Sequence, residues 1–120
     1  MGKTKPHNGN VPVNKPWGQY TDIYRTSSVV FKKIEVLPDE EISYQYHLGR
    51  GEFWYILSGH GSLTIDNTTF DVTAGESFQI DAELPHQIKN TGDIPITIFE
   101  MQFGDCQEED IVRLSDKYER

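Results

Sequence analysis

Residues 43–54 read SYQYHLGRGEFW, in which polar side chains alternate with aromatic ones. Because successive side chains of a β-strand point to opposite faces, Gln45 and His47 are expected to share one face, with tyrosines on the other. The glycines of LGRG permit the backbone angles of a turn that brings Glu52 back beside His47. One strand face would thus carry several possible metal ligands.

The rest of the chain favours an all-β fold. Segments such as SSVVFKKIEVL, EFWYILS and ITIFEMQFG are rich in β-branched and aromatic residues, and Gly, Pro, Asn and Asp separate them. Short strands at this spacing indicate a sandwich or barrel, and 120 residues suit one domain. We predict a flexible N-terminal arm over residues 1–14 and a single domain over residues 15–120. The spacing of Ile111, Leu114 and Tyr118 predicts a short amphipathic C-terminal helix.

Composition narrows the classes of function. A formal charge of −8 argues against nucleic-acid binding, which needs a basic surface. No apolar run is long enough to cross a membrane, and the N-terminal segment lacks the apolar stretch of a signal peptide. Cys106 is the single cysteine, so no internal disulfide can form. We therefore expect a cytoplasmic protein that acts without membrane or nucleic acid.

The segment ITIFEMQFG, residues 96–104, offers a second pair of candidate side chains. In a strand, Glu100 and Gln102 would share a face and could line the mouth of a barrel beside a metal. The three residues on the opposite face would then form the core of the sandwich. These are Phe99, Met101 and Phe103.

Two stretches resemble the paired motifs of the cupin superfamily, which implies a double-stranded β-helix, or jelly-roll barrel. In the first, Gln45 stands where the first cupin histidine would be, and His47, Glu52 and Gly59 match the rest of the motif. The second motif is matched by Gly75, His86 and Asn90, although Asp81 and Glu83 replace its usual proline and glycine. Either histidine alone could be an ordinary half-buried ring bonded to the backbone, but their joint spacing favours a metal site.

A narrower resemblance is to the type II mannose-6-phosphate isomerase cupin, often the C-terminal module of bifunctional enzymes that also carry mannose-1-phosphate guanylyltransferase. It rests on KPWGQY, FKKIEV, SYQYH, ITIFEMQFGD and EEDIVRLSDKYER, which occur in that order between residues 15 and 120. The Gln-x-His pair also matches, since this family has glutamine at the position of Gln45. The chain departs from the family at Leu48, Gly49 and Phe53, where histidines are usual.

The resemblance implies an isomerase that interconverts mannose 6-phosphate and fructose 6-phosphate through a cis-enediolate. One divalent metal is expected, zinc first, with manganese, iron, cobalt or nickel as alternatives. Four residues are expected to hold it: Gln45, His47, Glu52 and His86. Glu100 and Arg113 are expected to be catalytic. Arg113 is also the favoured phosphate ligand, and Lys32, Arg50 and Gln102 are expected to bind the sugar phosphate.

Two other functions stay open at this stage. The departures at Leu48, Gly49 and Phe53 suit a cupin module that binds a metal and a sugar without turnover. A cupin with other metal chemistry, such as a dioxygenase, would ordinarily use a stronger ligand than the amide of Gln45. In each case we expect a homodimer, because uncovered sheet edges invite association.

Overall fold

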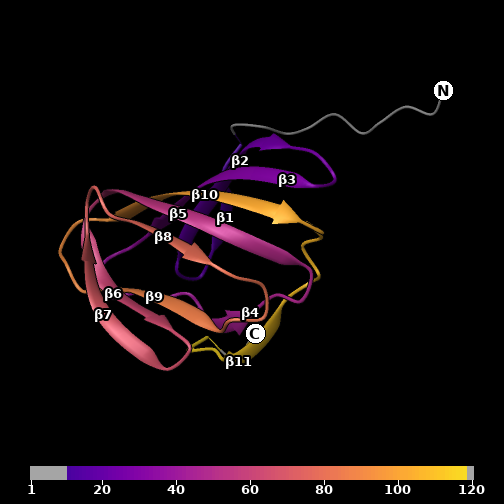
Figure 1. Ribbon diagram of the computed structural model, residues 1–120. Helices are drawn as coiled ribbons and strands as arrows, with labels where there is room; N and C mark the ends of the chain where they lie inside the picture. Colours follow the sequence, from indigo (N-terminus) through magenta and orange to yellow (C-terminus); the bar gives the residue numbers. More distant parts are fainter. Residues whose placement is uncertain (1–10, 119–120) are drawn as a thin grey trace.

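The computed structural model describes residues 11–118, which form two antiparallel sheets facing each other (Figure 1). One sheet has six strands, in the spatial order β1 (Val13–Lys15), β2 (Gly18–Arg25), β3 (Val29–Val36), β10 (Ile96–Gly104), β5 (Arg50–Ser58) and β8 (Ser77–Ile80). The other has five strands, in the order β11 (Val112–Ser115), β4 (Tyr44–Tyr46), β9 (His86–Asn90), β6 (His60–Ile65) and β7 (Thr68–Thr73). The all-β jelly-roll prediction is confirmed. None of the described residues forms a helix that could cross a membrane.

The hydrophobic core lies between the two sheets. Along β5, Trp54 and Ile56 point inward and are almost fully buried, whereas Tyr55 and Leu57 alternate with them on the outer face. Burying one such large apolar side chain contributes about 1.5–3 kcal/mol to folding. The core cluster takes side chains from both sheets: Trp17, Ile34, Val36, Ile42, Trp54, Ile56, Leu63, Val72, Ile80, Ile88, Ile96 and Ile98.

Two turns require particular backbone angles. Asp66 and Asn67 join β6 to β7 with φ angles of 48° and 67°, as a tight hairpin with two left-handed residues demands. Gly59 carries the chain from one sheet to the other with φ at 86°. A Cβ atom at Gly59 would also lie 2.8 Å from the carbonyl oxygen of Pro95. Both the positive φ angle and this close contact therefore exclude a side chain at this position.

The predicted C-terminal helix is wrong. Val112–Ser115 instead form β11, which pairs antiparallel with β4 and places Arg113 opposite Gln45. The spacing of the apolar residues suited a helix, but the backbone groups of β4 offer hydrogen bonds that a helix could not use. Tertiary pairing therefore overrides a weak helical pattern, as it often does in short segments.

One half of the face assignment of β10 is correct, because Glu100 and Gln102 line the barrel interior as predicted, but the expected aromatic core is wrong. Met101 and Phe103 are exposed and Phe99 is only half-buried, whereas Glu100 and Gln102 point between the sheets and are almost fully buried. The aromatic side chains therefore do not build the core. Of the predicted N-terminal arm, residues 1–10 lie outside the described residues, and β1 begins at Val13.

Candidate metal centre

Three side chains from opposite sheets meet inside the barrel. Glu52 belongs to β5 of the six-stranded sheet, His86 opens β9 of the five-stranded sheet, and His47 directly follows β4 of that same sheet. The ring nitrogen Nε2 of His86 lies 2.8 Å from Oε1 of Glu52, and Nε2 of His47 lies 3.5 Å from the same oxygen. All three side chains are almost fully buried. The segment LGRG, residues 48–51, leads from β4 of one sheet into β5 of the other and so brings Glu52 beside His47.

Hydrogen bonds to the backbone fix the tautomer of both histidines. Nδ1 of His47 lies 2.6 Å from the carbonyl oxygen of Asp110, and Nδ1 of His86 lies 2.9 Å from that of Leu84. A carbonyl can only accept, so each Nδ1 carries a proton. In a neutral ring this leaves a lone pair on Nε2, and both Nε2 atoms face Glu52. This is the arrangement of histidines that bind metals, whose second nitrogen is held by an outer partner.

The donor set fits a divalent metal ion. Oε1 of Glu52 and Nε2 of His86 are buried without a hydrogen-bond partner, although they lie 2.8 Å apart. A carboxylate oxygen and an imidazole lone pair are both acceptors, so the contact needs a positive species, either a proton on the ring or a metal ion. Ligand atoms of His47, Glu52 and His86 all lie within 4.8 Å of one another. Two imidazoles and a carboxylate suit the first-row metals named above.

The charge state of Glu52 supports this arrangement. Burial by itself raises the pKa of Glu52, but the adjacent side chains of His47 and His86 outweigh burial and hold its pKa well below the usual range. The carboxylate therefore stays ionised inside the barrel. An ionised carboxylate and two oriented imidazoles are the protonation states that metal binding requires.

Gln45 lies next to these residues on β4. It is paired with His86 across the sheet and lines the same cavity as Glu52. Its amide oxygen accepts a hydrogen bond of 2.6 Å from the hydroxyl group of Ser43. Because an amide oxygen has two lone pairs, one remains for a metal ion.

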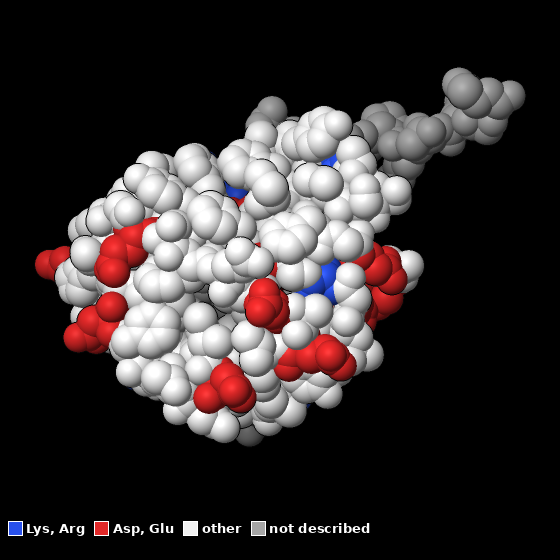
Figure 2. Space-filling model, in the orientation of Figure 1, with Lys and Arg blue, Asp and Glu red and all other residues white. Residues whose placement is uncertain are grey.

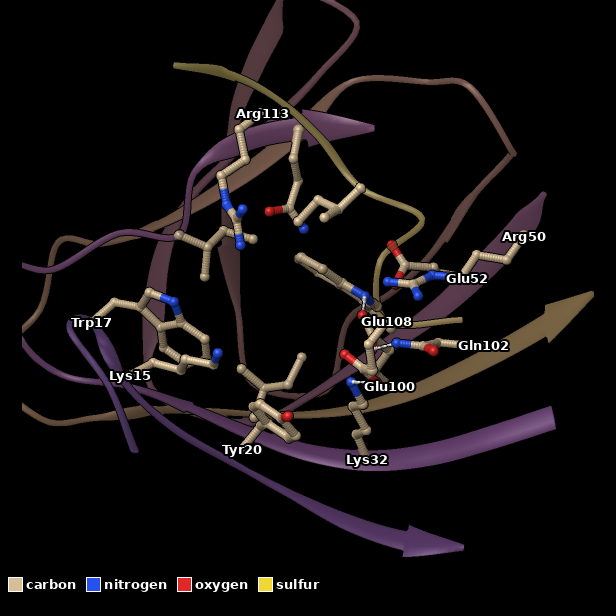
Figure 3. A pocket seen from close by; sticks show the side chains of 15 residues that line it. Lys15, Trp17, Tyr20, Lys32, Arg50, Glu52, Glu100, Gln102, Glu108 and Arg113 are labelled. Atoms are coloured by element: carbon tan, nitrogen blue, oxygen red, sulfur yellow. Dashed lines mark hydrogen bonds and ion pairs between the residues drawn. The ribbon is translucent and has the colours of Figure 1, made fainter. Parts of the chain in front are cut away.

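A cavity of about 240 Å³ reaches the candidate metal centre at Glu52 and Gln45, whereas His47 and His86 lie behind its lining. Figure 3 shows Arg50, Glu52, Glu100 and Gln102 on one side of this cavity, and Lys15, Trp17 and Arg113 on the other. Its complete lining is Lys15, Trp17, Tyr20, Lys32, Ile34, Ile42, Gln45, Arg50, Glu52, Trp54, Glu100, Gln102, Glu108, Ile111 and Arg113. A polar ligand could thus reach the candidate metal site with one end and two cations with the other.

Glu100 is the second carboxyl group of the cavity. It accepts hydrogen bonds from Nε1 of Trp54, at 2.7 Å, and from the amide of Gln102, at 2.6 Å. Burial, together with the charge of nearby Glu52, raises the pKa of Glu100 to about 8. Two neighbouring carboxyl groups with pKa values displaced in opposite directions are typical of acid–base sites.

The three candidate cations have different surroundings. The buried ammonium group of Lys32 forms a 2.9 Å ion pair with Glu108 and lies 4.3 Å from the centre of the Tyr20 ring. Arg50 lies against the metal-ligand candidates, with its Nη2 atom 3.2 Å from Nε2 of His47. Arg113 reaches the cavity from β11, on the side away from Glu52 (Figure 3).

Several residues around the site escaped the sequence analysis. Asp110 holds His47 through its carbonyl group, while its carboxylate accepts from the backbone amides of Leu48 and Gly49 at 2.9 and 2.8 Å. Asp110 directly precedes the segment whose spacing predicted a helix, and a helix there would not bring Asp110 to His47. Lys15 and Trp17 also line the cavity. Their signal was KPWGQY, a segment that was used only as a mark of the family.

Known protein families include one that matches nearly the whole chain. The family described as mannose-6-phosphate isomerase C-terminal matches residues 3–116. The chain belongs to this family. AlgA, an alginate biosynthesis protein of Pseudomonas aeruginosa, is 36% identical over 121 residues, which cover 100% of this chain and 25% of AlgA. A mannose-1-phosphate guanylyltransferase of Escherichia coli is 34% identical over 95% of this chain and 24% of its own length. This family member therefore spans about a quarter of the length of these relatives.

Solved structures share the fold of this family member. The cupin domain of Cnp3 from Schizosaccharomyces pombe matches 72% of this chain and 64% of its own with a TM-score of 0.70 and 18% identity. An oxalate decarboxylase of Lactobacillus farciminis, solved with formate, matches 87% of this chain and 33% of its own with a TM-score of 0.74 and 21% identity. At such identities the likeness establishes the cupin fold alone.

Proposed function

We propose that this chain is a metal-dependent sugar-phosphate isomerase that interconverts mannose 6-phosphate and fructose 6-phosphate through a cis-enediolate. The observation that carries the proposal is one cavity lined by Glu52 of the candidate metal site, by a second buried carboxyl group and by separate cations. Membership of the mannose-6-phosphate isomerase C-terminal family supports the choice of substrate. The relatives' names support a place in mannose and polysaccharide metabolism.

The metal would be held by the side chains that meet between the sheets: Gln45, His47, Glu52 and His86. When bound, a divalent ion supplies positive charge beside the carbonyl and hydroxyl oxygens of a sugar, and so favours an enediolate. Zinc is our first expectation. The backbone carbonyl groups that hold both Nδ1 atoms would keep the imidazoles oriented toward the ion.

Glu100 would carry the proton between C2 and C1. Its raised pKa means that the carboxyl group can hold a proton near neutral pH and release it to a neighbouring atom. Gln102 would position Glu100 through its amide group, and its own buried side-chain oxygen, which has no hydrogen-bond partner, could accept from a sugar hydroxyl. Both groups lie on the side of the cavity where Glu52 lies (Figure 3).

Arg113 would bind the phosphate group. A 6-phosphate is at the far end of the sugar from C1 and C2, and Arg113 lies across the cavity from Glu52 (Figure 3). A guanidinium group can bind phosphate through two parallel hydrogen bonds. Lys32 would add a second positive charge, whereas Arg50 would contact substrate oxygens nearer the metal ligands.

The deciding experiment is metal analysis of the purified protein, followed by a coupled isomerase assay after the metal has been restored. We expect about one divalent ion per chain and turnover of mannose 6-phosphate but not of mannose, because mannose lacks the phosphate that Arg113 would bind. Arg113→Gln should raise KM for mannose 6-phosphate more than it lowers kcat. Unchanged kinetics in Arg113→Gln would exclude Arg113 from substrate binding.

The same assays separate the two alternative functions. Binding of metal and mannose 6-phosphate without turnover would identify a non-catalytic binding module, which the departures at Leu48, Gly49 and Phe53 would then explain. Oxygen uptake with a small organic acid or thiol would identify a cupin dioxygenase. The expected cytoplasmic location stays a prediction.

We also propose that two copies of the chain pair through the outer face of the six-stranded sheet. Phe31, Met101 and Phe53 form one row across β3, β10 and β5 on that face. Met101 and Phe53 are about two-fifths exposed, as are Tyr55 and Leu57 on the same face of β5. In Figure 2 the upper part of the visible surface carries few charged side chains. A contiguous apolar sheet face of this kind typically marks an interface.

Met101→Glu is expected to convert the dimer into a monomer, because it places a charge in the centre of the apolar row. Light scattering at micromolar concentration measures the change. Glu109→Gln, which alters an exposed acid outside this face, serves as the control. A wild-type protein that is already monomeric would refute the proposal.

A further inference from the structure

Arg50 is a buried cation that touches the candidate metal ligands. It is the first residue of β5, and only 6% of its surface is exposed. Its Nη2 atom lies 3.2 Å from Nε2 of His47 and 3.7 Å from Oε2 of Glu52. Its Nη1 atom donates to the carbonyl oxygen of Gln107 at 3.3 Å, and its Nε atom is buried without a partner.

The contact between Arg50 and His47 uses the lone pair that a metal would need. Nδ1 of His47 donates to Asp110, so the ring has a single lone pair, on Nε2. A guanidinium group has only donors, and it therefore directs an N–H group at that lone pair. One lone pair cannot accept this hydrogen bond and bind a metal ion at the same time.

We infer that Arg50 competes with the metal ion for His47 and thereby sets the metal affinity of the site. Without metal, the guanidinium group satisfies His47 and balances the negative charge of Glu52. With metal, it must leave His47 and remain close to a second, divalent cation in a buried site where charges are poorly screened. The affinity is thus lower than the ligands alone would give. The inference rests on the metal centre proposed above.

Arg50 also lies close enough to Glu52 for a role of opposite effect, in which it supports metal binding, and the experiment below distinguishes the two roles. Arg50 could orient Glu52 as an outer partner, and its loss would then weaken metal binding. The distances favour competition, because Nη2 lies within hydrogen-bonding distance of His47 but not of Glu52. The two roles predict effects of opposite sign.

The test is zinc affinity, measured by competition with a chromophoric chelator, on metal-free protein with the fold checked by far-UV circular dichroism. Arg50→Gln and Arg50→Met remove the charge but keep much of the bulk, and each should bind zinc about 10- to 100-fold more tightly than wild type, the effect of releasing one hydrogen bond to a charged group. Arg50→Lys keeps the charge and should stay closer to wild type. Arg25→Gln is the matched control, since Arg25 pairs with Asp22 and Glu108 instead of the ligand candidates.

Each outcome has a distinct meaning. Tighter zinc binding in both neutral variants, with Arg25→Gln unchanged, supports the inference. Unchanged or weaker binding in the neutral variants overturns it and leaves the metal centre intact. Failure of wild type and all variants to bind zinc, manganese, iron, cobalt or nickel overturns the metal centre and this inference together.

Proton exchange at Arg50 tests the same inference on the wild-type protein. If zinc displaces Arg50 from His47, the guanidinium protons of Arg50 lose a buried acceptor and should exchange faster with water in ¹⁵N-edited NMR spectra. Unchanged exchange after zinc saturation would overturn the inference.

Discussion

Replacing His47 and His86 by alanine together is expected to abolish metal binding while the barrel stays folded. Each substitution removes an imidazole whose orientation the backbone fixes, and Glu52 with the amide of Gln45 is too weak a set to hold the ion alone. The core between the sheets is built from apolar side chains and does not include the metal ligands. Metal content by atomic emission and the far-UV circular dichroism spectrum measure the two parts of this result.

Two further variants calibrate that experiment. Gln45→Ala should reduce metal content less than either histidine substitution, because a neutral amide oxygen is the weakest donor of the set. His60→Ala is the matched control, since His60 is an exposed histidine on β6 that does not line the cavity. Equal metal content in wild type and in the double variant would show that the site lies elsewhere.

Glu100→Gln is expected to lower kcat for mannose 6-phosphate by about 10²- to 10⁴-fold, the usual contribution of a positioned acid–base group. Glutamine has nearly the same shape but cannot exchange the proton that the raised pKa allows Glu100 to carry. Metal content should be unchanged, because Glu100 is not among the proposed ligands. A coupled assay and metal analysis on the same preparation measure both quantities.

Two other results would change the role of Glu100. A kcat within a few-fold of wild type would move the acid–base role to another group. Loss of metal with loss of activity would indicate that Glu100 acts by supporting Glu52. Glu76→Gln, at an exposed carboxyl group that lies outside the cavity, should leave both kcat and metal content unchanged.

The barrel could be predicted from the spacing of the strands, and the resemblance to the two cupin motifs implied that the ligand candidates meet. Alternation in β5 and the turn at Gly59 determine which side chains face inward, and the structure brings His47, Glu52 and His86 together. Alternation and turn chemistry can be used in this way wherever the sequence itself determines the length of a strand and the position of a turn. Their role in binding a metal stays a prediction.

The errors arose where hydrophobicity alone was used to choose the buried face. For β10 the alternation was correct, but the aromatic face is outside because the inner face belongs to a polar cavity. At the C-terminus, the edge of β4 determined the structure of Val112–Ser115. Neither the cavity nor the partner strand can be read from the segment itself, because both are made by residues far away in the chain.

The position of the ligand candidates on opposite sheets links metal binding to the free energy of unfolding. An ion held by Glu52 from one sheet and His86 from the other binds the native barrel and not the unfolded chain, in which these residues are far apart. By mass action, a free metal concentration 100 times Kd would add about 2.7 kcal/mol to the free energy of unfolding. The lifetime of the folded protein in a cell would then follow the supply of that metal.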